Sequence, residues 1–175
     1  RPPLSKSLLA GEQKLADIYI RPKEIYQKAD VKFLLGVRAE VIDPANRNII
    51  LGNDSNIFYD KLALTVGSRV RKVSMPGDDL YGICYLRDYN DVQKIKSLVK
   101  EGGKAIIIGG GYIGLEAAAV LNKLGMQVTI LEMMSRVLER VTGPEISEFY
   151  SRVHTEEGVE IRCGVGASEF EGNKN

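Results

Sequence analysis

Three glycines in the middle of the chain have the spacing of a dinucleotide-binding loop. Gly109, Gly111 and Gly114 form a G-x-G-x-x-G pattern directly after the apolar run 104–108. The first glycine of such a loop permits a tight turn, the second lets the backbone approach a pyrophosphate, and the third lets helix and strand pack closely. Because the pattern lies between an expected strand and an expected helix, it predicts a dinucleotide site. Ile113, inside the loop, is included among the predicted cofactor-binding residues.

An acidic residue follows the next apolar run. Glu132 lies 18 residues after Gly114, at the end of 128–131. A carboxylate at this place can accept hydrogen bonds from both ribose hydroxyls of an adenosine. It would also repel a 2′-phosphate, since two like charges about 4 Å apart cost about 4 kcal/mol at an effective dielectric near 20. The sequence therefore favours NADH over NADPH, although the adenosine of FAD presents the same ribose diol.

Two arginines beyond this acid are further candidates. Arg136 and Arg140 follow Glu132 within about two turns and could contact phosphate or adenine. A solvated surface charge explains either position equally well. We include Arg140 among the predicted cofactor-binding residues.

Composition narrows the class of protein. Of 175 residues, 44% are hydrophobic and 27% are charged, the balance of a globular protein, and the net charge of +1 favours neither nucleic acid nor a membrane surface. No apolar run approaches about 20 residues, so no membrane span is expected. The single histidine and the distant pair Cys84 and Cys163 predict no metal site and no dithiol. So few cysteines fit a cytoplasmic protein.

The second half of the chain alternates between strand and helix patterns. Strands are predicted at 104–108, 127–131 and 159–162, and helices from Asp88 or Asn90 to 100, over 112–124, and from Thr142 or Pro144 to 156. This alternation predicts a parallel, doubly wound sheet with right-handed crossovers. The continuous apolar residues of 104–108 predict a strand that is covered on both faces.

The first half is made of shorter elements. Brief helices are predicted from Leu4 or Ser5 to Ala10 and over 22–28, with strands at 31–35, 38–42 and 48–51 and a buried strand at 61–67. The basic stretch 68–74 and the Met-Pro-Gly that follows it are the expected linker between two domains.

Several strings in combination resemble the NADH-dependent ferredoxin reductases, the FAD enzymes that serve Rieske-type dioxygenases and bacterial cytochromes P450. The strings are RPPLSK at 1–6, YDKL at 59–62, YLR at 85–87, GGGYIGLE at 109–116 and RVLERV at 136–141. The resemblance implies an α/β fold with two Rossmann-like dinucleotide-binding domains of the FAD/NAD(P) oxidoreductase type, both incomplete here. Residues 1–68 would be part of the FAD-binding domain, and 69–175 an NADH-binding domain without its C-terminal part.

The same resemblance implies roles for individual residues. It pairs Lys6 with Glu116 as the catalytic residues beside flavin and nicotinamide, and it assigns FAD contacts to Arg1, Ala39 and Arg87 as well as Lys6. Without the resemblance, Glu116 reads as a first-turn acid that stabilises its helix by about 0.3–1 kcal/mol. Lys6 alone reads as a solvated lysine.

The absence of a cysteine pair before Ser5 bears on where the electrons go. Disulfide reductases of this fold carry a cysteine pair just before the Ser5-Lys6 position, where this chain has none. The resemblance therefore implies an NADH:ferredoxin oxidoreductase, with FAD and NAD as cofactors and a [2Fe–2S] ferredoxin or rubredoxin as the one-electron acceptor. The alternatives are a flavoprotein of the apoptosis-inducing-factor type, with redox-controlled binding, and a disulfide or peroxide reductase. The sequence predicts no oligomeric state.

Overall fold

The chain divides into two compact units. The structure is a computed structural model that describes residues 2–172. One unit, here called the larger unit, combines the chain up to Ile18 with the chain from Arg69 onward, and the smaller unit is Tyr19–Ser68. Each unit is described by itself.

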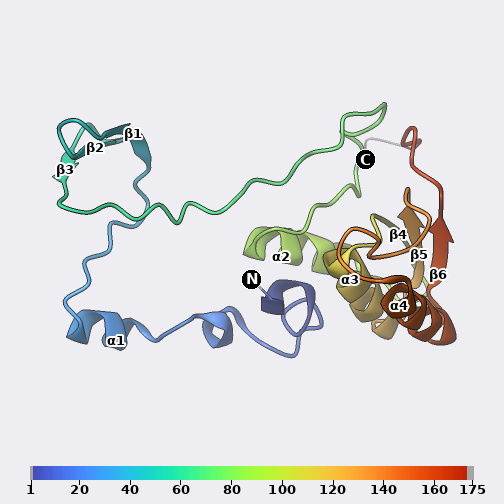
Figure 1. The fold of residues 1–175 in the computed structure, drawn as a ribbon. Helices are drawn as coiled ribbons and strands as arrows, with labels where there is room; N and C mark the ends of the chain where they lie inside the picture. Colours follow the sequence, from blue (N-terminus) through green and yellow to red (C-terminus); the bar gives the residue numbers. More distant parts are fainter. Residues whose placement is uncertain (1, 173–175) are drawn as a thin grey trace. The chain divides into compact units, whose positions relative to one another are not determined.

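A parallel three-stranded sheet forms the centre of the larger unit (Figure 1). Its strands β4 (Lys104–Ile108), β5 (Gln127–Glu132) and β6 (Glu160–Cys163) lie in the order β4-β5-β6. Helix α3 (Tyr112–Lys123) connects β4 to β5, and α4 (Pro144–Glu156) connects β5 to β6. The predicted strand–helix alternation is therefore confirmed, with boundaries that differ by one or two residues.

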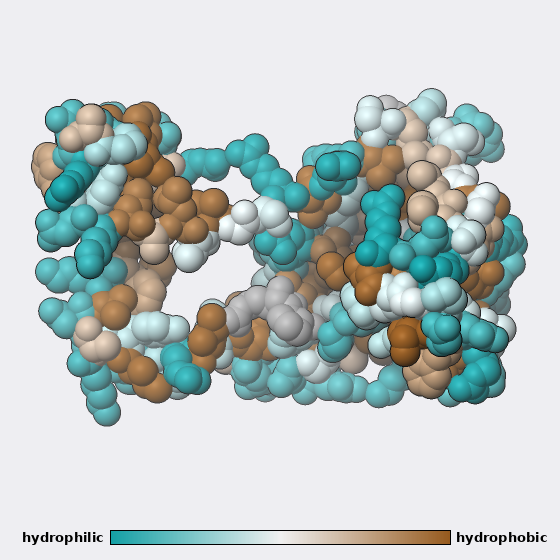
Figure 2. Space-filling view, in the orientation of Figure 1, coloured by the Kyte–Doolittle hydropathy of each residue, from teal (hydrophilic) through white to brown (hydrophobic). Residues whose placement is uncertain are grey.

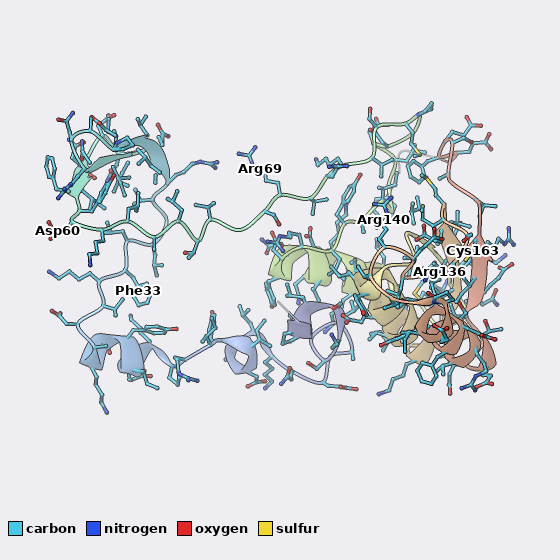
Figure 3. The ribbon with its side chains drawn as sticks, in the orientation of Figure 1. Phe33, Asp60, Arg69, Arg136, Arg140 and Cys163 are labelled. Atoms are coloured by element: carbon cyan, nitrogen blue, oxygen red, sulfur yellow. The ribbon has the colours of Figure 1, made fainter. Side chains whose placement is uncertain are left out.

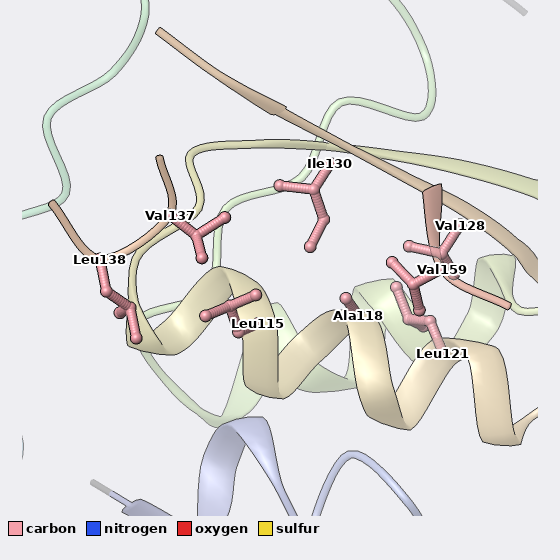
Figure 4. Close-up of a cluster of buried hydrophobic side chains, with 8 residues drawn as sticks. All are labelled: Leu115, Ala118, Leu121, Val128, Ile130, Val137, Leu138 and Val159. Atoms are coloured by element: carbon pink, nitrogen blue, oxygen red, sulfur yellow. The ribbon is translucent and has the colours of Figure 1, made fainter. Parts of the chain in front are cut away.

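Helix α3 packs on this sheet through one apolar face (Figure 4). Leu115, Ala118 and Leu121 are spaced at three-residue intervals, so they share one side of the helix. They meet Val128 and Ile130 of β5, and Ile130 is fully buried. This core fixes the start of α3 against the end of β4.

The opposite face of the sheet is open among the described residues. Ile106 and Ile108 of β4 are 68% and 43% exposed. The prediction that β4 is covered on both faces is therefore wrong for this chain. The three strands are added in one direction along the sheet, so right-handed crossovers place both connecting helices on the same side.

The first residues of the chain build a second core in the larger unit. The short 3-10 helices η1 (Pro2–Ser5) and η2 (Leu15–Ile18) flank a turn that ends at Gly11. The helix predicted up to Ala10 is thus a 3-10 helix followed by hydrogen-bonded turns. The buried members of this core are Leu4, Leu8, Leu9, Ile18 and Val92.

Helix α2 (Tyr89–Leu98) supplies Val92 to this second core. Its start is fixed by a capping box, in which the Asp88 side chain accepts from Asp91 N and the Asp91 side chain accepts from Asp88 N. The capping fixes the chain immediately before the helix, where Arg87 lies. Among the described residues, no helix has the length and apolar character needed to cross a bilayer.

The smaller unit contains α1 (Lys23–Lys28) and an antiparallel sheet. Strands β1 (Ala39–Asp43), β2 (Asn48–Leu51) and β3 (Asn56–Phe58) pair in sequence order. Strand β3 was not predicted, because three residues are too few to show the alternation of a strand. The sequence elsewhere predicted α1, β1 and β2 to within two residues.

Two predicted strands of the smaller unit are wrong. Residues 31–35 and 61–67 form no strand, and the segment expected to be buried includes Leu64 and Val66, which are 62% and 88% exposed. No described strand pairs with either segment, so their backbone groups have no ladder partners. Figure 2 shows hydrophobic side chains at the surface of this unit.

Candidate dinucleotide site

The glycine loop joins β4 to α3 and leaves the helix start open. Gly109 has a φ of +110°, and its N–H donates to the carbonyl of Leu131 at 2.8 Å. Gly111 is the N-cap residue of α3 and has no side chain to cap the first N–H groups. A Cβ on Gly109 or Gly111 would meet no atom within 4 Å. Open space at an uncapped helix start fits the pyrophosphate of a dinucleotide.

The third glycine has a different role. A Cβ on Gly114 would lie 2.1 Å from the carbonyl oxygen of Gly109 and 3.3 Å from Ile107 Cγ2. The helix can approach the strand this closely only because no side chain intervenes. Gly114 therefore determines packing, whereas Gly109 and Gly111 border the open space at the start of α3.

Glu132 is hydrogen-bonded to the glycine loop beside which it was predicted to bind a ribose. Its Oε2 accepts from Gly110 N at 2.7 Å, and its Oε1 accepts from Met134 N at 2.8 Å. A Cβ on Gly110 would lie 3.2 Å from Glu132 Oε2 and 2.9 Å from Val137 Cγ1, so glycine permits this approach. A carboxylate has about four acceptor positions, so each oxygen retains room for one further donor such as a ribose hydroxyl.

The segment 133–141, which follows β5, is hydrogen-bonded to the glycine loop. Leu138 N donates to the carbonyl of Gly110 at 2.9 Å. Leu138 is buried and has a φ of 55°, a conformation that costs a non-glycine residue roughly 1–2 kcal/mol. The surrounding contacts therefore hold this segment in place against a local preference for another conformation.

The two arginines of this segment differ (Figure 3). The Arg136 guanidinium donates to the carbonyls of Thr142 and Glu139 at 2.9 and 3.2 Å and to Ser147 Oγ at 2.5 Å. The Arg136 guanidinium therefore bonds within the protein, in place of the phosphate contact that was considered for it. Arg140 is exposed, so its side chain is accessible to a ligand.

A second cluster of predicted residues forms around Glu116. Lys6 Nζ lies 2.6 Å from Glu116 Oε1, and Ser5 Oγ donates to Glu116 Oε2 at 2.5 Å. Burial raises the pKa of the Glu116 carboxyl, but the hydrogen bonds from Lys6 and Ser5 and the Lys6 charge outweigh it, so the pKa falls below its ordinary value. Glu116 thus remains ionised at neutral pH.

The alternative interpretation of Glu116 as a first-turn acid is wrong. Helix α3 begins at Tyr112, and its first turn contains no acidic residue. The favourable interaction of an acid with the helix dipole falls off within that turn. The position of Glu116 is instead accounted for by its contacts with the first residues of the chain.

A pocket of about 250 Å³ opens beside this pair. It brings four predicted site residues together: Lys6, Arg87, Ile113 and Glu116. The complete lining is Leu4, Ser5, Lys6, Leu86, Arg87, Ile113 and Glu116. Arg87 is fixed through its backbone, since its N–H donates to Asp91 Oδ2 at 2.7 Å. Charged groups of both signs and an apolar wall suit the polar edge of a planar ring.

Ala39 and Arg1 are two further predicted cofactor contacts. Ala39 begins β1 in the smaller unit and is exposed. Arg1 lies outside the described residues. Ser5 was not predicted as a site residue, because its contact with Glu116 spans 111 positions and has no local sequence signal.

The remaining candidates for reaction chemistry are structural. Cys84 and Cys163 are free and partly buried, and burial raises the pKa of both thiols, which makes them poor nucleophiles. The ring nitrogens of His154 lie 3.0 Å from the carbonyl oxygens of Tyr150 and Leu115, so the ring links α4 to α3. Within 2–172, no group of three or more potential metal ligands occurs.

Comparison of the chain with known proteins identifies its family. The model of the pyridine nucleotide-disulphide oxidoreductase family matches residues 1–175. The chain belongs to this family. Its membership, with the parallel sheet, confirms the predicted α/β fold of the FAD/NAD(P) oxidoreductase type.

Relatives with assigned functions include several ferredoxin reductases. The chain is 41% identical over 171 residues to the ferredoxin reductase subunit of a 5,5′-dehydrodivanillate O-demethylase from Sphingobium, covering 97% of the chain and 42% of that protein. It is 37% identical over 173 residues to putidaredoxin reductase from Pseudomonas putida, covering 97% and 41%. The chain therefore spans less than half the length of these relatives.

Solved structures agree with the sequence relationship. Putidaredoxin reductase in its covalent complex with putidaredoxin superposes with a TM-score of 0.91 at 37% identity, over 97% of this chain and 42% of that one. A ferredoxin reductase from Rhodopseudomonas palustris gives 0.92 at 31% identity, over 99% and 43%.

Proposed function

We propose that the complete protein is an FAD-dependent NADH:ferredoxin oxidoreductase. The observation that carries this proposal is the Lys6–Glu116 pair in a pocket at the side of the helix that the glycine loop begins. With a rise of about 1.5 Å per residue, Glu116 lies roughly 7–8 Å along α3 from Gly111. One extended dinucleotide can therefore reach from the loop to the pocket.

The residues divide between the two ends of NADH. The loop from Gly109 to Gly114 would hold the pyrophosphate, and Glu132 and Arg140 would hold the adenosine end. Glu132 carries a charge that opposes a 2′-phosphate, which supports NADH as the coenzyme. Glu116 and Ile113 would face the nicotinamide end.

The chain's own residues would orient the nicotinamide and place charges beside the flavin. When bound, nicotinamide and flavin supply hydride transfer and the subsequent single-electron steps. Glu116 would accept a hydrogen bond from the carboxamide NH₂ and so fix the face of the ring. Lys6 and Arg87 would provide positive charge beside the flavin, with further FAD contacts from Arg1 and Ala39. We accordingly assign 1–68 to the FAD-binding domain and 69–175 to the NADH-binding domain.

The proposed acceptor is a one-electron carrier, a [2Fe–2S] ferredoxin or a rubredoxin. Relatives at 37–41% identity are named as reductases of ferredoxin or putidaredoxin, which supports a carrier of this kind. The two thiols whose pKa values are raised by burial offer no route through a disulfide. Free cysteines also fit the proposed cytoplasmic location.

Stopped-flow reduction of the complete flavoprotein tests this function. Bleaching of the flavin band by NADH should be much faster than by NADPH, and a [2Fe–2S] ferredoxin should rapidly restore it. Glu116→Ala should slow the first step, whereas Glu148→Ala, at an exposed acid of α4, should leave it unchanged. A preference for NADPH would remove the role given to Glu132. Failure to reduce any ferredoxin or rubredoxin would favour the apoptosis-factor type or a disulfide or peroxide reductase.

A further inference from the structure

Ser5 is one of two polar residues that are buried among the described side chains. The other, Ser147, has its hydroxyl engaged with Arg136 and with the carbonyl of Val137. Ser5 is 5% exposed, and its hydroxyl donates to Glu116 Oε2 at 2.5 Å. A buried hydroxyl that donates to a carboxylate makes a strong, charge-assisted hydrogen bond.

The two donors to Glu116 differ in how easily they can leave. The Lys6 side chain is 50% exposed, and water can replace its contact with Oε1. Ser5 lies in η1 beside the buried residues Leu4, Leu8 and Leu9, which anchor this turn in the second core. One carboxylate oxygen therefore has a replaceable partner and the other a fixed one.

We propose that Ser5 is a positioning residue, which holds Glu116 Oε2 so that Oε1 alone exchanges its partner between Lys6 and the carboxamide of the coenzyme. The inference rests on the proposed function, because it assigns Glu116 to the nicotinamide. Without Ser5 the carboxylate is free to rotate about its terminal torsion, and Lys6 can then occupy both oxygens. A coenzyme would meet a less defined acceptor.

Removing the hydroxyl has a second expected consequence. The Ser5 hydrogen bond is one of the contributions that lower the pKa of Glu116, while burial acts in the opposite direction. In Ser5→Ala the pKa of Glu116 should therefore rise. A purely space-filling serine would leave the pKa unchanged.

The test uses the complete flavoprotein and two readouts. The rate of flavin reduction by NADH is measured by stopped flow from pH 5 to 8 for the wild type, Ser5→Ala and Ser5→Thr. A hydrogen bond to a charged group corresponds to a loss of roughly 10-fold or more in Ser5→Ala. The loss should be larger at the acid end, and Ser5→Thr, which retains a hydroxyl, should recover most of the rate. Ser97→Ala, at an exposed serine of α2, is the matched control.

The second readout does not depend on turnover. In oxidised protein with ¹³C-labelled glutamate, the side-chain carboxyl resonance missing from Glu116→Gln identifies Glu116, and its titration gives the pKa. The pKa should rise in Ser5→Ala and remain in place in Ser5→Thr and Ser97→Ala. An unchanged pKa together with an unchanged rate in Ser5→Ala overturns the inference.

The outcomes remain separable if a variant or the function fails. If Ser5→Ala loses its flavin, Ser5→Cys keeps the volume with a weaker donor, and wild-type values in that variant count against the inference. If NADH does not reduce the wild type, the proposed function fails, and the titration still decides whether Ser5 controls Glu116.

Discussion

The two units of this chain contain similar residue types but bury them to different extents. In the larger unit, one cluster buries leucine, isoleucine and valine side chains between helix α3 and the sheet. A second buries the same residue types between the first residues of the chain and the helices. In the smaller unit, Leu51 is the one buried hydrophobic side chain among the described residues, with 6% of its surface exposed. The apolar residues of 31–35 and 61–67 remain largely exposed. Strands β1 and β4 also carry exposed apolar side chains, but each has a ladder partner, which 31–35 and 61–67 lack.

The largest expected effect is a difference in local stability between the units. In the 175-residue chain, amide hydrogens of β5 should exchange about a thousandfold or more slowly than those of 61–67, because only β5 has ladder bonds beneath a packed core. Hydrogen exchange with mass spectrometry measures both segments in one sample. Equal protection would show that the smaller unit is stabilised by contacts that the structure lacks.

Two isoleucines test the contrast at single positions. Ile130→Ala in β5 should lower the free energy of unfolding by about 2–5 kcal/mol, because it empties a fully buried site. Ile20→Ala, at a side chain that is 65% exposed, should change it by less than about 0.5 kcal/mol. Urea unfolding of the 175-residue chain, followed by circular dichroism, gives both values. A similar cost at both sites would contradict the contrast.

The contrast should disappear in the complete flavoprotein. Leu35 is 81% exposed here, in a segment for which no strand partner is described. If the rest of the protein covers this segment, Leu35→Ala should cost about 2 kcal/mol or more there, while remaining near zero in the 175-residue chain. The measurement is the shift of the unfolding midpoint of each form. A neutral substitution in both would mean that Leu35 is a surface residue of the whole protein.

The smallest expected effect is confined to the larger unit and depends on pH. The pKa of Glu116 lies below its ordinary value of 4.5, so its pairing stabilises the fold above that pH and is lost as the pH falls through the lowered pKa. Wild type should exceed Glu116→Gln in stability at pH 6.5, by about 1 kcal/mol or less because Lys6 is half exposed. The difference should shrink as the pH falls below 4.5. A difference that grows with acid would contradict the direction of the shift.

The sequence predicted the larger unit well for a local reason. Its helices have their own start signals, such as the capping box before α2, and each of its strands begins within two residues after a glycine. Helix type and order therefore follow from neighbouring residues. The exposure of Ile106 and the absence of strands at 31–35 and 61–67 depend on which other segments are nearby, and no local pattern contains that information.

The candidate site divides in the same way. The glycine loop and Glu132 could be predicted from spacing, because strand, turn and helix place them within a single βαβ unit. The Lys6–Glu116 pair was predicted only from the family resemblance, and the contact of Ser5 with Glu116 is seen only in the structure. Both contacts join residues more than 100 positions apart, so no local pattern indicates them. Arg136 also lies at a suitable distance from Glu132 in the sequence, but its guanidinium donates to backbone carbonyls of the protein itself.

Under the proposed function, the bond between Glu132 and Gly110 would link coenzyme choice to the architecture of the loop. The carboxylate that would meet the ribose also holds the middle of the glycine turn and the start of the segment that carries Arg140. Replacing it by a small neutral residue removes the repulsion of a phosphate and, in the same step, two anchors of the binding surface. A change of coenzyme in this protein therefore requires a substitute for those anchors, and removal of the charge alone should give an enzyme that uses both coenzymes poorly.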